Sequence, residues 1–226
     1  MKKLPILFIG CLICFIARAE SYRIACKHNA DIGLNQNNTL AIVPSTLYTN
    51  LLAWFTFSYG DDPDVNYADY DYSLSLQSNT VYGSGIIEFN GDGEARTQSD
   101  LMDAEGYYIR AQFDSVLGNR YLVARAYNNF SWHLYSYRLE CYIDSVAKYS
   151  DQTLSTGTWY DLIYNRNAHF FIDASQCTYE SGWSLSGNVN AFGGNDGNRY
   201  LDGRIDTIIV SDRAFTTNEI VFFSRQ

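Results

Sequence analysis

The chain has 226 residues, of which 46% are hydrophobic and 16% aromatic, and it contains only three prolines. This length and composition suit one globular all-β domain. The 25 acidic residues outnumber the 16 basic ones, which gives a formal net charge of −9. Such a charge excludes the basic surface that nucleic-acid binding requires, whereas it suits solubility and the binding of divalent cations.

The first 19 residues have the features of a secretory signal peptide. Two lysines precede an apolar run, and Ala-Arg-Ala provides a small-residue cleavage site. The run is shorter than the ~20 residues that a membrane-spanning helix needs. We therefore expect a secreted protein without a membrane span, or one anchored by a lipid at Cys11 if the segment is a lipoprotein signal. Residues 20–48 are interpreted as an N-terminal extension and residues 49–226 as the folded domain.

Three cysteines, Cys26, Cys141 and Cys177, remain after removal of the signal peptide. They allow one disulfide and one free thiol in an exported chain. If the strands between Cys141 and Cys177 pair in sequence, antiparallel reversal places these two residues far apart, which leaves Cys26 as the partner of either. No Cys-x-x-Cys occurs and the three histidines are scattered, so the sequence does not indicate a zinc site.

Alternation of apolar and polar residues dominates the chain from residue 52 to residue 210, and this is the period of half-buried strands. Clusters of Gly, Asn and Asp separate the runs and suit tight turns. The runs are 52–57, 72–76, 85–89, 107–113, 121–126, 131–139, 142–147, 159–164, 170–172 and 205–210. They predict an all-β fold, a two-sheet antiparallel jelly-roll β-sandwich, with Trp159 or Tyr160 facing inward.

One short helix is predicted near residues 217–223, after the last strand. Thr216 and Glu219 have the spacing of a capping box, in which each side chain binds a backbone amide of the other residue. Phe215 and Ile220 flank them as a hydrophobic staple. We expect this C-terminal helix to pack at the edge of the sandwich.

Two segments carry a resemblance to a known family. Residues 157–173 contain two alternating strands joined by a polar turn, and residues 199–220 contain a strand that leads into the helix. In this order they resemble the closing half of a laminin G-like domain of the concanavalin A-like lectin/glucanase superfamily. Upstream, residues 52–57 are similar to the family's opening strand and residues 86–91 to a later strand and turn. The resemblance implies a jelly roll that most often binds glycans or other surfaces rather than catalyses.

The resemblance also implies a calcium site. In the family, an Asp of the loop after the opening strand can share a structural Ca²⁺ with the Asp of the late Gly-x-Ile-Asp strand. Here five aspartates lie between residues 61 and 71, although Tyr70 and Tyr72 stand where the family usually has small residues. The implied ligands are Asp69, Asp71 and Asp206. The alternative is a plain solvated acidic loop.

Aromatic residues near amide and carboxylate groups indicate a shallow glycan site, because aromatic faces stack on sugar rings while Asn and Asp bind hydroxyls. Trp183 lies in an otherwise polar Ser-Gly stretch, and Tyr135 and Tyr137 would share one strand face. The candidate ligand-binding residues are Trp183, Asn190, Asn195, Asp196, Tyr135 and Tyr137. The alternative is that the two tyrosines are core residues and that Trp183 covers an edge.

The sequence contains no strong pattern of a catalytic site. Glu140 and Asp144 would share a strand face, but with Cα atoms roughly 13 Å apart, which is long for a retaining glycosidase. Gly-x-Ser-x-Gly is absent, and Ser131 and His133 are interpreted as simple strand alternation. The sequence favours a secreted, non-catalytic module for a carbohydrate or cell-surface ligand. The alternatives are a structural or adhesive surface or virion-appendage protein that acts through protein contacts, and a glycoside hydrolase on the same fold.

Overall fold

The computed structural model describes most of the chain after residue 49, within the compact unit Ser45–Ser224. The described residues are 50–57, 66, 68, 72–83, 85–124, 131–143, 146–165, 169–177, 187–194 and 199–224. The expected signal peptide, the N-terminal extension and Cys26 lie outside them. In the part that the structure describes, no helix is long and apolar enough to cross a membrane.

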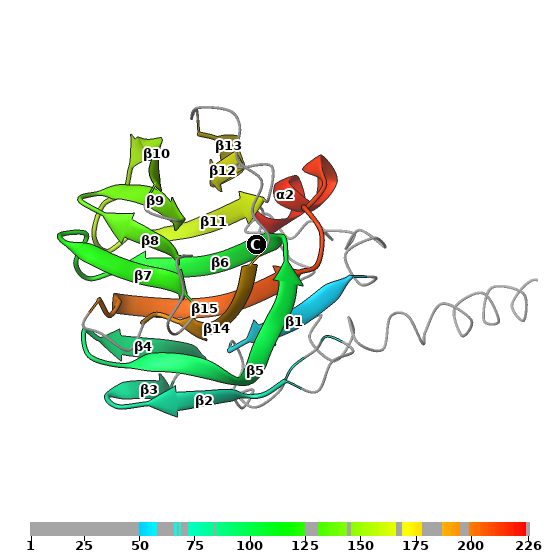
Figure 1. Ribbon diagram of the computed structural model, residues 1–226. Helices are drawn as coiled ribbons and strands as arrows, with labels where there is room; N and C mark the ends of the chain where they lie inside the picture. The colour runs from blue at the N-terminus through cyan, green and yellow to red at the C-terminus, as the bar shows by residue number, and fades with distance from the viewer. Residues whose placement is uncertain are drawn as a thin grey trace, which may run out of the picture. The chain divides into compact units, whose positions relative to one another are not determined.

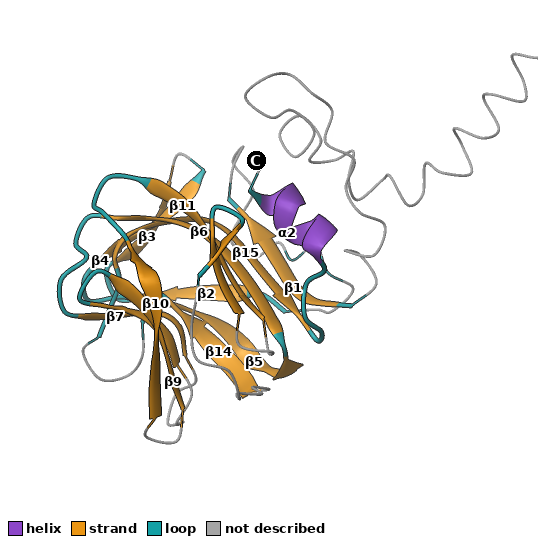
Figure 2. Cartoon of the chain, turned by 90° about the horizontal axis from the view of Figure 1, so that it is seen from above, coloured by secondary structure: helices purple, strands orange, loops and turns teal. Residues whose placement is uncertain are grey.

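Two antiparallel sheets pack face to face in a β-sandwich (Figures 1 and 2). The eight-stranded sheet has the order β13 (Ser175–Gln176), β12 (His169–Ile172), β11 (Trp159–Asn165), β6 (Gly106–Phe113), β15 (Asp202–Ser211), β4 (Ile86–Asn90) and β3 (Thr80–Gly83), and β1 (Leu51–Thr56) also pairs with β15. The seven-stranded sheet has the order β10 (Val146–Thr153), β9 (Arg138–Ile143), β8 (Ser131–Tyr135), β7 (Asn119–Ala124), β14 (Gly187–Phe192), β5 (Glu94–Ala104) and β2 (Leu74–Gln77). The predicted all-β, two-sheet fold is confirmed.

The core fills the space between the sheets, because each strand turns alternate side chains toward it. In β8, Trp132 and Leu134 are completely buried there. Tyr160 packs against the same core, with its ring 6.3 Å from that of Phe113, whereas Trp159 lies outside it beside Arg110. Of the two residues expected to face inward, Tyr160 does so. Each large apolar side chain that is fully removed from water contributes about 1.5–3 kcal/mol.

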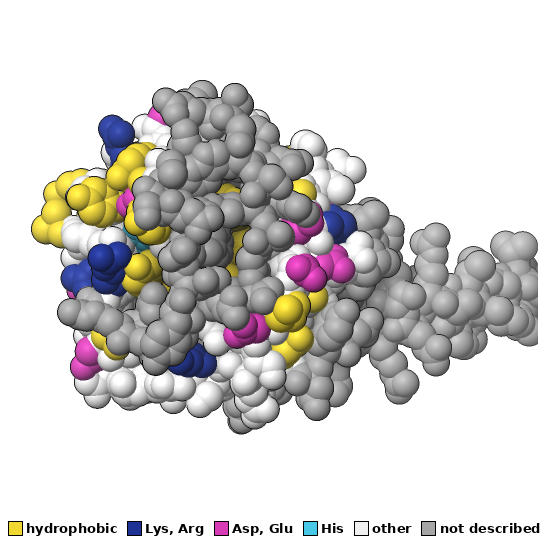
Figure 3. All heavy atoms as spheres, viewed as in Figure 1, with side chains coloured by type: hydrophobic (Ala, Val, Ile, Leu, Met, Phe, Trp, Pro, Cys, Tyr) yellow, Lys and Arg dark blue, Asp and Glu magenta, His cyan; other side chains and the backbone are white. Residues whose placement is uncertain are grey.

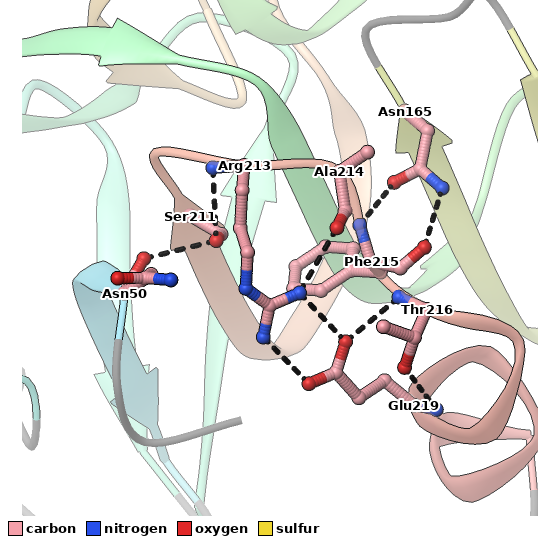
Figure 4. A network of polar contacts seen from close by, with 8 residues as sticks. All are labelled: Asn50, Asn165, Ser211, Arg213, Ala214, Phe215, Thr216 and Glu219. Carbon is pink, nitrogen blue, oxygen red and sulfur yellow. Dashed lines mark hydrogen bonds and ion pairs between the residues drawn. The ribbon is translucent and has the colours of Figure 1, made fainter. Parts of the chain in front are cut away.

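The helix α2 (Thr217–Phe223) begins as the sequence predicts. Thr216 Oγ1 accepts a hydrogen bond from Glu219 N at 3.4 Å, and Glu219 Oε2 accepts one from Thr216 N at 2.8 Å (Figure 4). The ring of Phe223 stacks on Tyr108 of β6 with centroids 4.3 Å apart. Because Tyr108 is turned away from the core, the helix covers the outer face of the eight-stranded sheet rather than the expected edge.

Side chains fasten the segment that enters α2 to the sheet (Figure 4). Asn165 of β11 accepts a hydrogen bond from Phe215 N at 2.8 Å and donates one to Phe215 O at 3.0 Å. Arg213 donates to the two carboxylate oxygens of the buried Glu219 at 2.7 and 2.9 Å. Polar groups in this segment are therefore satisfied despite their burial, which favours one position of the helix.

Cys141 lies on β9 and Cys177 follows β13, so the two belong to different sheets, and both are buried free thiols. The strand pairing expected between them is only partly right, because β11 and β12 pair in sequence as expected but the strand before them does not pair with β11. Residues 140–147 do not form one strand, because β9 and β10 meet there as a hairpin of the seven-stranded sheet. Burial raises the pKa of the Cys177 thiol to about 12 and that of Cys141 well above its usual range, so both stay protonated.

Candidate functional site

The candidate site lies on the outer face of the seven-stranded sheet, the side turned away from the core. In β8 the buried core residues Trp132 and Leu134 alternate with outward residues, and the same alternation continues in the neighbouring strands. The outward residues of β7, β8, β9 and β10 form rows across the strands. These rows are Asn119, Tyr135, Arg138 and Thr153; then Tyr121, His133, Glu140 and Tyr149; and then Ala124, Ser131, Tyr142 and Ala147.

A two-residue turn between β8 and β9 sets the register of these rows. Its residues, Ser136 and Tyr137, have positive φ angles of 46° and 74°, as a type I′ hairpin turn requires. Hydrogen bonds of 3.1 Å from Ser136 N to Gly118 O and from Tyr137 N to Val116 O hold the turn in place. The turn thereby places the outward side chains of β8 directly opposite those of β9.

A chain of hydrogen bonds runs from Ser131 of the third row into the middle row. Ser131 Oγ lies 3.0 Å from His133 Nδ1, and His133 Nε2 lies 2.8 Å from Glu140 Oε2. Tyr121 contacts the other side of the imidazole edge-on, with ring centroids 5.2 Å apart. Burial, the charge of Glu140 and a hydrogen bond to its carboxylate raise the pKa of the Tyr149 phenol. Two tyrosines are thus positioned by one buried histidine–carboxylate pair.

Hydroxyl, imidazole and carboxylate in this order are the parts of an activated nucleophile. Here the parts are enclosed, since Ser131 is 3% exposed, His133 2% and Glu140 5%. A substrate cannot reach Ser131 Oγ in this conformation, so the bonds satisfy buried polar groups and hold the row. The interpretation of Ser131 and His133 as simple alternation missed this chain. The Ser-x-His spacing followed by a glutamate was its signal, but only the turn brings Glu140 opposite His133.

Four exposed tyrosines surround the buried chain, and we call them the tyrosine patch. Tyr135, Tyr137, Tyr142 and Tyr149 are 43%, 45%, 37% and 42% exposed. The rings of Tyr135 and Tyr149 lie 6.0 Å apart, centroid to centroid. Figure 3, which looks onto this face, shows hydrophobic and basic side chains gathered over the ends of β7, β8 and β9. Exposed aromatic surface of this kind makes this face the candidate binding surface.

The candidate ligand residues from the sequence are only partly brought together. Tyr135 lies on the outer face, but Tyr137 lies in the turn and does not share its strand face, because β8 ends at Tyr135. Neither tyrosine is in the core. Asn190 is on β14, beyond β7, where it donates to Asp100 Oδ1 at 3.0 Å. The other three candidates, Trp183, Asn195 and Asp196, lie outside the described residues.

The calcium ligands expected from the sequence are Asp206, on β15, and two residues outside the described part, Asp69 and Asp71. One carboxylate oxygen of Asp206 lies 3.5 Å from Arg110 Nε. Within the described ranges, no group of three or more His, Cys, Asp or Glu side chains could hold a metal ion. Calcium binding therefore stays a prediction.

A second polar cluster, which the sequence analysis did not identify, lies on the outer face of the eight-stranded sheet. Asp161 Oδ1 accepts a hydrogen bond from Tyr108 at 2.9 Å and lies 3.5 Å from Arg110 Nη1. Arg110 also approaches the ring of Trp159 at 6.0 Å from its centroid. Burial raises the pKa of Asp161 to about 6 despite the nearby guanidinium. This carboxylate titrates in a range where an ordinary Asp is ionised.

No protein-family model matches the chain, and no curated protein matches it in sequence. Solved structures are similar to it at low identity. Domain 4 of AbnA, a GH43 extracellular arabinanase from Geobacillus stearothermophilus, in complex with arabinotriose, is 14% identical with a TM-score of 0.60, over 77% of this chain and 98% of that one. A Trypanosoma rangeli sialidase in complex with the inhibitor DANA is 13% identical with a TM-score of 0.62, over 97% of this chain and 39% of that one.

A third similar structure is that of botulinum neurotoxin type C, whose cell entry depends on interaction with two ganglioside molecules. It is 11% identical with a TM-score of 0.55, over 80% of this chain and 53% of that one. The chain thus spans nearly all of the arabinanase domain but only about half or less of the toxin and sialidase chains. At these identities the matches show the jelly-roll β-sandwich fold alone.

Proposed function

We propose that this protein is a secreted, non-catalytic, laminin G-like module that binds glycans through the tyrosine patch. The observation that carries the proposal is the exposure of Tyr135, Tyr142 and Tyr149 on one half of a sheet face, together with that of Tyr137 in the adjoining turn. A tyrosine offers a flat apolar ring and a hydroxyl, which suit the C–H face and the hydroxyls of a sugar. Within the patch, the rings of Tyr135 and Tyr149 already contact each other, so these two side chains lose less freedom when a ligand binds.

The similar structures support this proposal. The match to the arabinanase domain covers almost all of that domain, which was solved with arabinotriose, and the neurotoxin depends on gangliosides. A shared fold is weak warrant for a shared ligand. The argument therefore rests on the patch itself, and the similar structures add that sandwiches of this shape occur in proteins that bind or process sugars.

A glycoside hydrolase on this fold would need two carboxyl groups that reach the same glycosidic bond. Glu140 is buried and hydrogen-bonded to His133, so its carboxylate is covered and engaged rather than open to a sugar. Asp144, its expected companion, lies outside the described residues. The engagement of Glu140 favours binding over hydrolysis.

A structural calcium is part of the proposal. The hydrogen bond from Phe57 N to Asp206 O, 2.9 Å long, places the end of β1 beside Asp206. Asn66, in the acidic segment that follows β1, accepts a hydrogen bond from Trp54 N at 2.8 Å. Phe57, which precedes the acidic segment, therefore lies next to Asp206, and Asn66 within the segment contacts β1, which supports Asp69 and Asp71 as partners of Asp206 around a hard cation.

Glycan binding is tested with the double variant Tyr135→Ala/Tyr149→Ala on an array of neutral and acidic glycans. We expect the wild type to bind a subset of the array and the variant to lose at least tenfold in apparent affinity. The control is Val81→Ala on β3, because Val81 is as exposed as the tyrosines but belongs to the other sheet. Equal binding by the wild type and the double variant, with matching thermal midpoints, would show that the patch is not the site.

A further inference from the structure

The arginines of this acidic chain are distributed unequally between ion pairs and open surface. Among the described residues, every arginine of the eight-stranded sheet and its helix has a carboxylate partner within 3.5 Å. These pairs are Arg110 with Asp161 and Asp206, Arg204 with Glu88 and Asp114, and Arg213 with Glu219. On the seven-stranded sheet, Arg96 pairs with Glu94 at 2.5 Å.

Arg138 and Arg199, by contrast, have no carboxylate partner within the described part of the chain. Both are exposed. Arg138 stands directly opposite Tyr135 of the tyrosine patch. Arg199 lies over the ring of Tyr121, 5.7 Å from its centroid, and its Nη1 donates to the Tyr121 hydroxyl at 2.9 Å. The two guanidinium groups therefore flank the aromatic surface from neighbouring rows.

Hydrogen bonds of the fold fix the position of Arg199. Tyr121 N donates to Arg199 O at 2.9 Å, so the backbone is bound to β7 at the same residue that supports the side chain. Arg120 Nη1 donates to Tyr200 O at 3.0 Å and fixes the next residue. A guanidinium held in this way loses little further freedom when it binds a ligand. A freely solvated surface arginine would not need these contacts.

The negative charge nearest to this surface does not neutralise it. Glu140 lies in the middle row, but it is buried and engaged by His133, so it is not presented to a ligand. Among the described residues of the three rows and of the segment beside β7, Arg138 and Arg199 carry the exposed charges. In a chain of net charge −9, two open arginines beside exposed tyrosines are the opposite of what the overall composition predicts.

We propose that the bound glycans are acidic, and that Arg138 and Arg199 bind their carboxylate or sulfate groups while the sugar rings pack on the tyrosine patch. The guanidinium fork matches the two oxygens of such groups better than a single hydroxyl. Strand spacing places the Cα atoms of Arg138 and Tyr121 roughly 12 Å apart. An oligosaccharide, rather than one sugar, would therefore reach both arginines. This inference rests on the proposed glycan binding at the same face.

The test compares lactose, 3′-sialyllactose and 3′-sulfolactose, within a wider array of neutral and acidic glycans, as ligands of the wild type and of Arg138→Gln and Arg199→Gln. We expect the wild type to bind acidic glycans at least tenfold more tightly than their neutral parents and to weaken as NaCl rises. Each variant should lose most of that preference, and the Lys substitutions should restore part of it. The carboxylate and sulfate arms show which acidic group is preferred.

Arg204→Gln is the matched control, because Arg204 is a partly exposed arginine on the opposite sheet. It should leave the preference unchanged. If the wild type binds no acidic glycan, or if the Gln variants keep the preference, the inference is overturned. If instead acidic and neutral glycans bind equally and Tyr135→Ala/Tyr149→Ala abolishes both, the inference fails while the proposed glycan binding stands. Thermal midpoints of all variants confirm that each is folded.

Discussion

His133 shows how a single side chain can order a surface without being exposed on it. Its two ring nitrogens lie within hydrogen-bond distance of Ser131 Oγ and Glu140 Oε2, so a polar residue that is almost fully buried has a partner at each end. Burial without such partners would cost about 1–3 kcal/mol for each unsatisfied group. The imidazole in turn supports the Tyr121 ring that carries Arg199. An almost fully buried residue thereby positions one that a ligand can meet.

On the opposite sheet, the raised pKa of Asp161 links the stability of the protein to pH. Its folded-state pKa of about 6 exceeds the 3.8 of an ordinary Asp because burial disfavours the charge. The folded protein therefore binds this proton more tightly than the unfolded chain does. Protonation of Asp161 should therefore raise the free energy of unfolding as the pH falls through about 6, and this increase is complete below about 4. At neutral pH, the ionised carboxylate lowers stability.

We expect Asp161→Asn to remove this titration. The Asn oxygen can still accept the hydrogen bond from Tyr108, and Arg110 keeps Asp206. The stability of the variant relative to the wild type should fall by on the order of 2 kcal/mol between pH 7.5 and pH 4. Urea unfolding at several pH values measures it, with the exposed Asp114→Asn as control. A difference that does not change with pH would contradict the assignment.

At the scale of elements, the helix and the hairpin show what the sequence could and could not predict. The capping box of α2 was predicted because its signal is local: Thr216 and Glu219 satisfy each other's amides without help from the rest of the fold. The β8–β9 turn was missed because Ser136 and Tyr137 are not the Gly and Asn that favour positive φ. Tertiary bonds to the 116–118 loop hold the turn instead.

This missed turn explains why the candidate site was only partly predicted. With residues 131–139 taken as one strand, Tyr135 and Tyr137 fall on the same face and Glu140 has no position relative to His133. The hairpin instead moves Tyr137 into the turn and brings Glu140 opposite His133. Alternation gives the strands and their buried faces, but long-range contacts decide which outward residues meet.

The N-cap of α2 should contribute measurably to the stability of the protein. Thr216→Ala removes the oxygen that accepts from Glu219 N and should cost about 1 kcal/mol, which lowers the thermal midpoint by roughly 2–4 °C in a domain of this size. Thr217→Ala, at the exposed next position, is the control and should change the midpoint by much less. Differential scanning calorimetry measures both. Equal effects of the two substitutions would show that the cap does not stabilise the helix.

At the scale of the whole molecule, the sandwich is closed by strands that lie far apart in the sequence. β1, the first strand, pairs with β15, the last, from Leu51 opposite Ser211 to Thr56 opposite Thr207. Within the described part of the chain, the first and last strands are therefore neighbours. Because loop closure over such a distance costs entropy, an additional link between the segment after β1 and β15 would stabilise the fold. A bound cation at Asp206 would form such a link.

The last prediction concerns that link. If Asp69, Asp71 and Asp206 share a calcium ion, calcium binds the folded state preferentially and raises the free energy of unfolding by about 2.7 kcal/mol at a concentration 100 times its Kd. We expect the thermal midpoint to rise in CaCl₂ over EDTA for the wild type and the rise to be largely lost in Asp206→Asn. The exposed Asp212→Asn, just after β15, is the control and should keep it. If the wild type melts at the same temperature in CaCl₂ and in EDTA, the acidic segment binds no structural calcium, and the ion pair with Arg110 is a contact that the Asp206 carboxylate makes without one.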